Sequence, residues 1–425
     1  MQAPSTSVGG RIASRAPAGS WVGAAAALFT VGWGANQFSS LLLAYRQHAH
    51  ISATTANALF GVYAVGLIPA LLIGGRLSDR HGRRIVVPVV GLSALATVTL
   101  MLGGTVGVGA LYPGRFLAGV VSGLAFAPGT AWVKELSSPP WGDVGDPHVG
   151  ARRAAVALSA GFGAGPLVAG VLAQWAPAPT VVPYIAHLVV VVVAAPWVWR
   201  APETVGAGGL AAPPARLEGP GRGGLFGDRR PAPLRSRRPD PRFVRMAAPM
   251  APWVFAAASV AFAVLPAQVT RRTGHYEVLF AAVVAGLTLL VGVAVQPYAR
   301  RLDIRSEARG MQAGLGSVTA GMAMGAAAAA TAQPWLVLVA AVLLGAGYGT
   351  CLVSGLLEVQ RVARPDALAG LTAVFYALTY IGFAAPVVIS SLAGAADTTV
   401  VLLCATGLCA LTLVAVSAGR RRLGA

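Results

Sequence analysis

Residues 75–84 read Gly75-Arg76-Leu77-Ser78-Asp79-Arg80-His81-Gly82-Arg83-Arg84, a polar stretch between two apolar runs at about 56–75 and 85–105. Each run has the roughly 20 residues that a helix needs to cross the hydrocarbon core of a bilayer. In lipid, a spanning segment must satisfy its backbone hydrogen bonds internally, so runs of this length indicate helices. The pattern predicts a tight polar turn between two membrane-spanning helices.

The composition extends this prediction to the whole chain. Its 425 residues are 56% hydrophobic and only 11% charged, with a mean hydropathy of +0.69, whereas soluble domains carry about 25% charged residues. A water-soluble fold is therefore excluded. We expect twelve spanning helices, at about 21–43, 56–75, 85–105, 109–133, 153–175, 180–199, 243–265, 277–296, 310–330, 334–360, 368–394 and 398–417.

The basic residues define the expected topology. The chain has 32 Lys and Arg against 14 Asp and Glu, and with an even number of spans 28 of the basic residues fall on the side of the two termini. This asymmetry follows the positive-inside rule. It explains the pI near 11.2 without nucleic-acid binding, so we expect no nucleic-acid partner. We expect cytoplasmic tails at 1–20 and 418–425, six-helix bundles at 21–199 and 243–417, and a flexible cytoplasmic linker at 200–242, rich in Pro, Gly and Arg.

The spacing of residues 75–84 resembles the signature loop of the major facilitator superfamily, G-x-L-x-D-R-x-G-R-R/K. The resemblance implies a gating loop made of Gly75, Asp79, Arg80, Gly82, Arg83 and Arg84. It also implies that Asp79 meets the start of the eleventh span, near residues 365–368, in the outward-open state. Gly75 and Gly82 are expected to allow backbone conformations that side chains would forbid. A plain basic loop is the alternative interpretation.

Two further stretches resemble motifs of the same family. Arg115 and Gly119 match its R-x-x-x-G motif in the fourth span, which implies a role for Arg115 in proton transfer or in setting nearby pKa values. Snorkelling of Arg115 to lipid headgroups is the alternative. In the fifth span, Gly161, Gly165, Pro166 and Gly170 resemble an antiporter motif found mainly in exporters, although Ala169 replaces its penultimate glycine. This motif favours export over import.

Polar side chains within the spans are candidates for a substrate cavity. We expect Asn36, Gln37, Tyr376 and Tyr380 to contribute to it, with helix–helix hydrogen bonding as the alternative. No acidic residue falls at the middle of a span. His187 could carry the coupling proton, or it could be a hydrogen-bonded structural residue.

The sequence thus predicts an all-α membrane protein with twelve helices in two pseudo-symmetric bundles, the fold of the major facilitator superfamily. The function we expect is that of a secondary transporter of a bacterial inner membrane, a monomer that exports a small amphipathic compound in exchange for protons. An uncoupled facilitator or importer of a small metabolite is the alternative. The histidines and cysteines form no metal-binding or catalytic pattern, and no phosphate-binding loop is present, so we expect no metal, no cofactor and no enzymatic activity.

Overall fold

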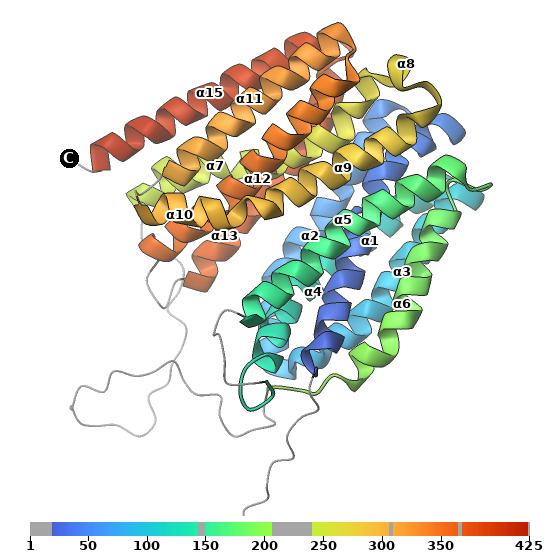
Figure 1. Cartoon of the computed structure of the whole chain (residues 1–425), viewed down its shortest axis with the longest axis vertical. Helices are drawn as coiled ribbons and strands as arrows, with labels where there is room; N and C mark the ends of the chain where they lie inside the picture. The colour runs from blue at the N-terminus through green and yellow to red at the C-terminus, as the bar shows by residue number, and fades with distance from the viewer. Residues whose placement is uncertain (1–18, 143–148, 206–239, 306–308, 364–367, 424–425) are drawn as a thin grey trace, which may run out of the picture.

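The computed structural model describes residues 19–142, 149–205, 240–305, 309–363 and 368–423, and every regular element in these ranges is a helix (Figure 1). Most of the predicted N-terminal tail and of the predicted linker lies outside the described residues. The helices fall into two groups, one before and one after the linker.

The first group contains six long helices that pack closely on one another. α2 packs on α4, α1 packs on α5 and α6, and α3 packs on α4 and α6. Its elements are α1 (Trp21–His48), α2 (Ala53–His81), η1 (Arg83–Ile85), α3 (Val86–Thr105), η2 (Val108–Ala110), α4 (Leu111–Leu136), α5 (Val149–Trp175) and α6 (Val182–Arg200).

The second group has more interrupted helices. α12 packs on α11, α9 and α7, and α15 packs on α11. Its elements are η3 (Phe243–Ala247), α7 (Ala248–Ser259), η4 (Val260–Val264), η5 (Pro266–Gln268), α8 (Thr270–Thr273), η6 (Gly274–Tyr276), α9 (Glu277–Ala294), α10 (Gln296–Arg305), α11 (Arg309–Thr331), α12 (Pro334–Val362), α13 (Leu368–Ile381), η7 (Gly382–Ala384), α14 (Ala385–Leu392) and α15 (Thr398–Leu423).

We call the end of the molecule at which α6 ends and η3 begins the linker end, and the other end the far end. The two groups touch mainly through α5 on α9, α1 on α9 and α2 on α14. In Figure 1 the groups meet where α8 and the neighbouring ends of α5 and α9 lie, and they diverge toward the ends of α4 and α13.

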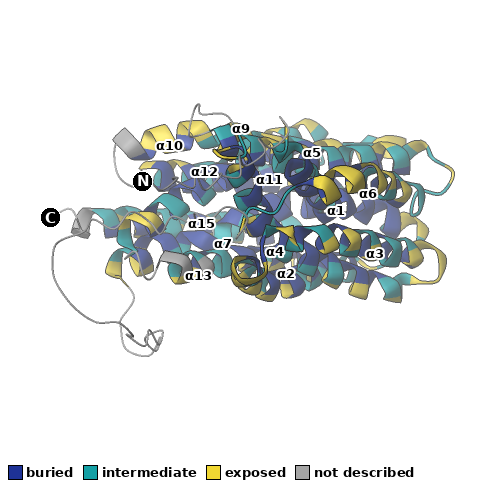
Figure 2. Cartoon of the chain, turned by 90° about the horizontal axis from the view of Figure 1, so that it is seen from below, coloured by how far each residue is buried: buried dark blue, intermediate teal, exposed yellow. Residues whose placement is uncertain are grey.

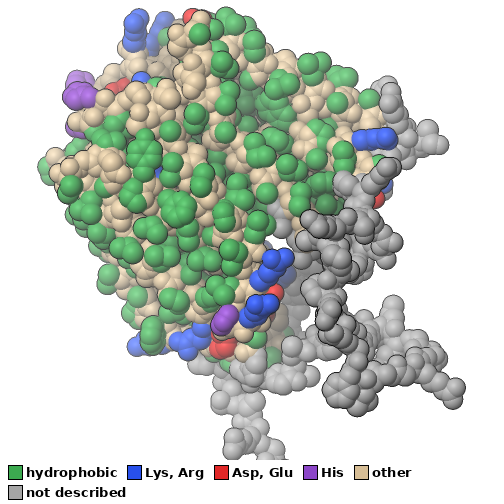
Figure 3. All heavy atoms as spheres, turned by 180° about the vertical axis from the view of Figure 1, so that it is seen from behind, with side chains coloured by type: hydrophobic (Ala, Val, Ile, Leu, Met, Phe, Trp, Pro, Cys, Tyr) green, Lys and Arg blue, Asp and Glu red, His purple; other side chains and the backbone are tan. Residues whose placement is uncertain are grey.

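The outer surface is that of a membrane protein. Figure 3 shows hydrophobic side chains over the middle of one face, with Lys and Arg near its margins, and Figure 2 shows exposed residues mainly on the outer faces of the helices. Eleven segments of the described chain are long and apolar enough to cross a membrane. The 28-residue α1 lies in the same bundle but is not among them, because Asn36, Gln37, Ser39 and Ser40 lower its hydropathy.

The polar stretch at 75–84 is mostly helical, so the prediction of a tight turn there was wrong. α2 continues to His81, and only Gly82 turns the chain, at φ +94°. A Cβ at Gly82 would also collide with the carboxylate of Glu203, whereas Gly75 is helical and has open space around it. The requirement for glycine therefore holds at Gly82 alone. α15 likewise continues to Leu423, into the predicted C-terminal tail.

Small residues set the distance between helices, as expected where lipid provides no hydrophobic drive for their association. On α4, Gly119 and Gly123 lie against the backbone of α2 around Tyr63 and Leu67, with no room for a Cβ. This close approach fixes α4 on α2 and places Arg115, one turn before Gly119, beside the carbonyl of Leu59.

Candidate functional site

A cavity of about 450 Å³ lies between the two groups of helices. It runs from the middle of the molecule, near Arg115, to the linker end, where the exposed Lys134 of α4 lies at its mouth. Its wall is mainly apolar and aromatic, and it consists of Ala35, Asn36, Phe60, Tyr63, Leu71, Arg115, Phe126, Ala127, Thr130, Ala131, Lys134, Leu158, Phe162, Phe255, Ala258, Phe262, Leu289, Tyr348, Leu352, Tyr376, Tyr380 and Phe383. The volume is within the range of sites for small organic ligands.

The two groups close against each other toward the far end, along the contact of α5 with α9. A Cβ at Gly170 would collide with Ala282, and one at Gly163 would lie 2.9 Å from a methyl carbon of Leu290. Gln174 adds hydrogen bonds, because its Oε1 accepts from the backbone N–H of Leu279 at 3.2 Å and its Nε2 donates to the carbonyl of His275. We call this contact the α5–α9 seam.

The other antiporter-like residues pack α5 against α1 within the first group. Gly161 lies against the carbonyl of Phe29, and a Cβ at Gly165 would come within 2.6 Å of the carbonyl of Trp33. The carbonyl of Pro166 accepts a hydrogen bond from Ser40 Oγ at 2.7 Å. The four residues of the motif therefore hold α5 between α1 on one side and α9 on the other.

Arg115 is the charged group at the inner end of the cavity. Its side chain is 1% exposed, so it does not reach lipid headgroups and the snorkelling alternative was wrong. It donates from Nε to the carbonyl of Leu59 at 3.2 Å and from Nη1 to the carbonyl of Ala35 at 3.4 Å. Its guanidinium carbon also lies 4.6 Å from the ring centre of Tyr63 and 4.7 Å from that of Phe38, within the range of cation–π attraction.

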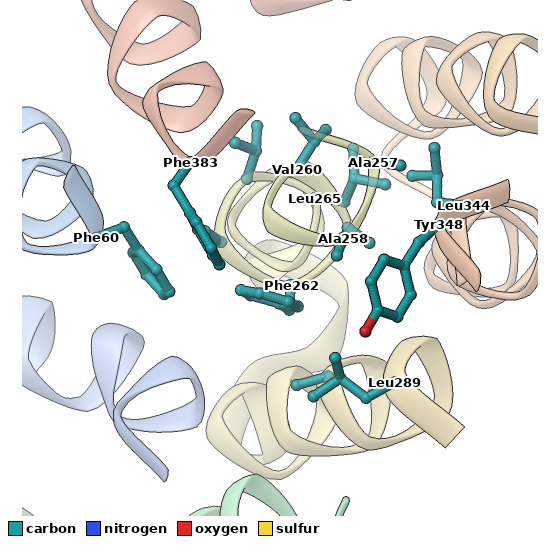
Figure 4. Packing of buried hydrophobic residues seen from close by; sticks show 14 of the residues in the cluster. Phe60, Ala257, Ala258, Val260, Phe262, Leu265, Leu289, Leu344, Tyr348 and Phe383 are labelled. Atoms are coloured by element: carbon teal, nitrogen blue, oxygen red, sulfur yellow. The ribbon is translucent and has the colours of Figure 1, made fainter. Parts of the chain in front are cut away.

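Aromatic side chains of the second group form the opposite wall of the cavity. Phe255 stacks on Tyr380 with ring centres 4.6 Å apart and on Phe383 with ring centres 4.9 Å apart. Tyr348 and Tyr376 extend this aromatic wall. Figure 4 shows Phe60 of α2, Phe383 of η7 and Tyr348 of α12 around Phe262 of η4.

The structure separates the predicted cavity residues. Asn36, Tyr376 and Tyr380 line the cavity, but Gln37 does not. The Nε2 of Gln37 instead lies 3.5 Å from Thr97 Oγ1, inside the first group. His187 is also outside the cavity wall; its Nδ1 lies 2.7 Å from Thr97 Oγ1 and its Nε2 lies 3.0 Å from the carbonyl of Thr30. Both ring nitrogens have hydrogen-bond partners, which favours the alternative prediction that His187 is a structural residue.

The polar stretch at the linker end forms an ion-pair network. Arg83 Nη1 lies 2.7 Å from Asp79 Oδ1, and Arg83 Nη2 lies 2.9 Å from Glu135 Oε1. Arg84 donates from Nη2 to the carbonyl of Trp199 at 2.9 Å, and Arg80 is exposed. The expected partner region of Asp79, at residues 365–368, lies almost entirely outside the described residues.

Glu203 anchors the end of α6 to the turn after α2. Its Oε1 accepts from the N–H groups of Arg83, Thr204 and Val205, and its Oε2 accepts from the N–H of Arg84, all at 2.8–2.9 Å. Partial burial of this carboxyl would raise its pKa, but these four hydrogen bonds hold the pKa below its ordinary value.

We expect Glu203→Gln to lower the free energy of unfolding by about 1–2 kcal/mol, because bonds to a charged acceptor are lost. Since the folded-state pKa is below the unfolded value of about 4.5, this contribution is complete at neutral pH and disappears as the pH falls through the folded-state pKa. Thermal unfolding in detergent between pH 7 and pH 3 measures it. Arg80→Gln, at the same end, is the control and should change little. An equal deficit of Glu203→Gln at both pH extremes would contradict the assignment.

Several residues of the site were not singled out from the sequence. Glu135 and Lys134 follow each other at the end of α4, yet one pairs with Arg83 and the other faces the cavity mouth. Phe60, Phe255 and Phe383 lie in apolar runs, where a residue of the cavity wall has the same sequence pattern as a core residue. The adjacent charges at 134–135 were the only available signal.

Known proteins share both the sequence pattern and the fold. The sequence profile of the Major Facilitator Superfamily matches residues 22–387, whereas the search of curated proteins gave no match. Among solved structures, the chain is similar to a variant of a POT family peptide transporter, with a TM-score of 0.72, 14% identity and 94% of each chain covered.

Two other solved structures show the same likeness. A POT family transporter in complex with 5-aminolevulinic acid has a TM-score of 0.69 at 12% identity, over 93% of this chain and 94% of that one. The nucleoside transporter NupG has a TM-score of 0.67 at 10% identity, over 94% of this chain and 98% of that one. With the profile match over most of its length, the chain belongs to the Major Facilitator Superfamily.

Proposed function

We propose that this protein moves a small molecule across the membrane by alternating access. The observation that carries the proposal is the cavity between the two groups of helices, which reaches the linker end and is closed from the far end by the α5–α9 seam. Opening the seam and closing the linker end would expose the same cavity to the other side. The similar peptide and nucleoside transporters support transport in general.

We further propose that transport is efflux of a small amphipathic compound coupled to protons. Most basic residues of the described chain lie at the linker end, which by the positive-inside rule supports a cytoplasmic linker end and both termini on the cytoplasmic side of a bacterial inner membrane. The cavity therefore takes substrate from the cytoplasm. The antiporter-like motif supplies the seam, Arg115 is the candidate for coupling, and the ion-pair network of residues 79–84 is the candidate for gating. We expect a monomer to suffice, since the cavity lies within one chain.

An uncoupled facilitator is the second candidate, and one observation favours it. No Asp or Glu is among the described residues that line the cavity. A carboxylate in the cavity is the simplest means of alternating protonation with substrate binding, because its charge changes with the proton. Inside-out vesicles with an acid interior and a pH-sensitive dye separate the two candidates. Substrate-triggered proton release supports exchange, and substrate movement without it supports facilitation.

Thiol labelling tests alternation itself. Ala127→Cys, in a background with Cys351, Cys404 and Cys409 replaced by Ala, places a thiol on the exposed cavity wall. We expect a membrane-impermeant maleimide to modify it from either face of the membrane, because each state opens the cavity to one face. Ala24→Cys, at a position 0% exposed and away from the cavity, is the control and should stay unmodified. Labelling of Ala127→Cys from one face alone would contradict alternating access.

A further inference from the structure

The charged residues that line the cavity in the described part of the chain, Arg115 and Lys134, are both basic. Arg115 lies at its inner end and Lys134 at its mouth, and the described residues of the wall include no carboxylate. A cleft with apolar walls concentrates the field of such charges, so it attracts anions and repels cations. Lys134 lies where an entering molecule would first meet the protein.

Arg115 has unused capacity for an anionic ligand. A guanidinium carries five N–H donors, and Arg115 uses only the two hydrogen bonds to the carbonyls of Leu59 and Ala35. No ion pair joins it to any Asp or Glu in the described part of the chain. A buried cation without a counter-ion is costly, and this cost falls when a carboxylate binds beside it with charge-assisted hydrogen bonds.

The aromatic wall supplies the second half of a binding site. Tyr63 connects the two halves, because its ring lies under the guanidinium of Arg115 and 5.9 Å from the ring of Phe383. Phe383 in turn stacks with Phe255 and Tyr380. Flat apolar groups bind well to such faces, and Figure 4 shows Phe383 and Phe262 near Phe60 of the first group.

We propose that the substrate is a singly charged organic carboxylate with an aromatic or flat apolar body. The carboxylate binds the free N–H groups of Arg115, and the body lies against Phe255, Tyr380 and Phe383. This inference rests on the proposed function. It specifies that the small amphipathic substrate proposed there is an anion. It excludes amphipathic cations, for which the wall offers no counter-charge.

Three ligands with the same body test the charge requirement: 4-phenylbutanoate, its neutral amide and 4-phenylbutylamine. Binding is measured by calorimetry and thermal shift at neutral pH on the purified full chain in detergent. We expect the carboxylate to bind at least about tenfold more tightly than the other two, which is the size of one charged hydrogen-bond interaction. Arg115→Gln should remove this preference, and Arg115→Lys, which keeps the charge, should retain part of it. Arg271→Gln, at an exposed far-end position, is the matched control and should leave it unchanged.

Equal or tighter binding of the amine or the amide, binding of none of the three, or a preference that survives Arg115→Gln would each overturn the inference. The wild-type measurements decide the question even if a variant fails to fold. Different results would refute the proposed function and the anion-binding site. If Ala127→Cys is labelled from one face only while the carboxylate is preferred, alternating access is refuted and the anion site stands. If the protein exchanges the amine in preference to the carboxylate, transport stands and the anion site is refuted.

Discussion

Gly170→Leu is expected to reduce transport by about 10- to 100-fold, as overpacking of a close contact costs 1–3 kcal/mol. The physical reason lies in the α5–α9 seam, where even a Cβ at Gly170 would collide with Ala282 and come within 3.4 Å of Ser40. A leucine acts mainly as a wedge between the two groups, because its closest collision is with Ala282 of α9, and it presses less closely on Ser40 of α1. The state with a closed far end then becomes the less populated one.

Substrate exchange in proteoliposomes and labelling of Ala127→Cys measure this effect together. We expect the exchange rate to fall while labelling decreases from the linker end and increases from the far end. Gly61→Leu is the matched control, since nothing lies within 4 Å of a Cβ at Gly61 on α2. Transport at the wild-type rate by Gly170→Leu would show that the seam is not a moving contact.

Arg115→Ala is expected to reduce transport by about 100-fold while the melting temperature stays within a few degrees of the wild type. The loss of the charged hydrogen bonds that we propose between the guanidinium and the substrate carboxylate accounts for a transport effect of this size. Stability behaves differently, because the removed group is a buried cation whose desolvation no carboxylate offsets. The carbonyls of Leu59 and Ala35 lie within helices, where backbone N–H groups already bond to such carbonyls.

Transport assays and thermal unfolding of the same preparations provide the comparison. Arg271→Ala removes an exposed far-end arginine and should leave both quantities unchanged. A parallel loss of transport and of melting temperature in Arg115→Ala would assign Arg115 to the packing of α1, α2 and α4 instead of to the transport cycle.

The helices could be predicted from the sequence because their apolar runs have the length of a bilayer crossing. α3, predicted at 85–105 and observed at Val86–Thr105, and α6, predicted at 180–199 and observed at Val182–Arg200, differ by at most two residues at either end. The end of α2 could not be placed in this way. A polar sequence at a membrane surface continues as a helix as readily as it turns, and only the positive φ of Gly82 ends this one.

The site was predictable only in part, for reasons of geometry. Successive residues of a helix point about 100° apart, so the side of α1 that turns Ala35 and Asn36 toward the cavity turns Gln37 away from it. Asn36 lines it, whereas Gln37 lies near Thr97. Arg115 was identifiable because a cation within a span is rare. Phe255 and Phe383 could not be identified from the sequence, because they line a cavity whose position depends on the tertiary packing of several helices.

The low hydropathy of α1 has a consequence for the biosynthesis of the protein. Most of α1 is buried against its neighbours, and Gln37 and Ser40 gain their hydrogen-bond partners only after α3 and α5 have arrived. When it leaves the ribosome, α1 has none of these partners and gains less from entering lipid than any of the eleven segments that are long and apolar enough to span a membrane. Compared with these segments, α1, which brings Asn36 to the cavity, is thus the helix whose insertion depends most on the helices synthesised after it.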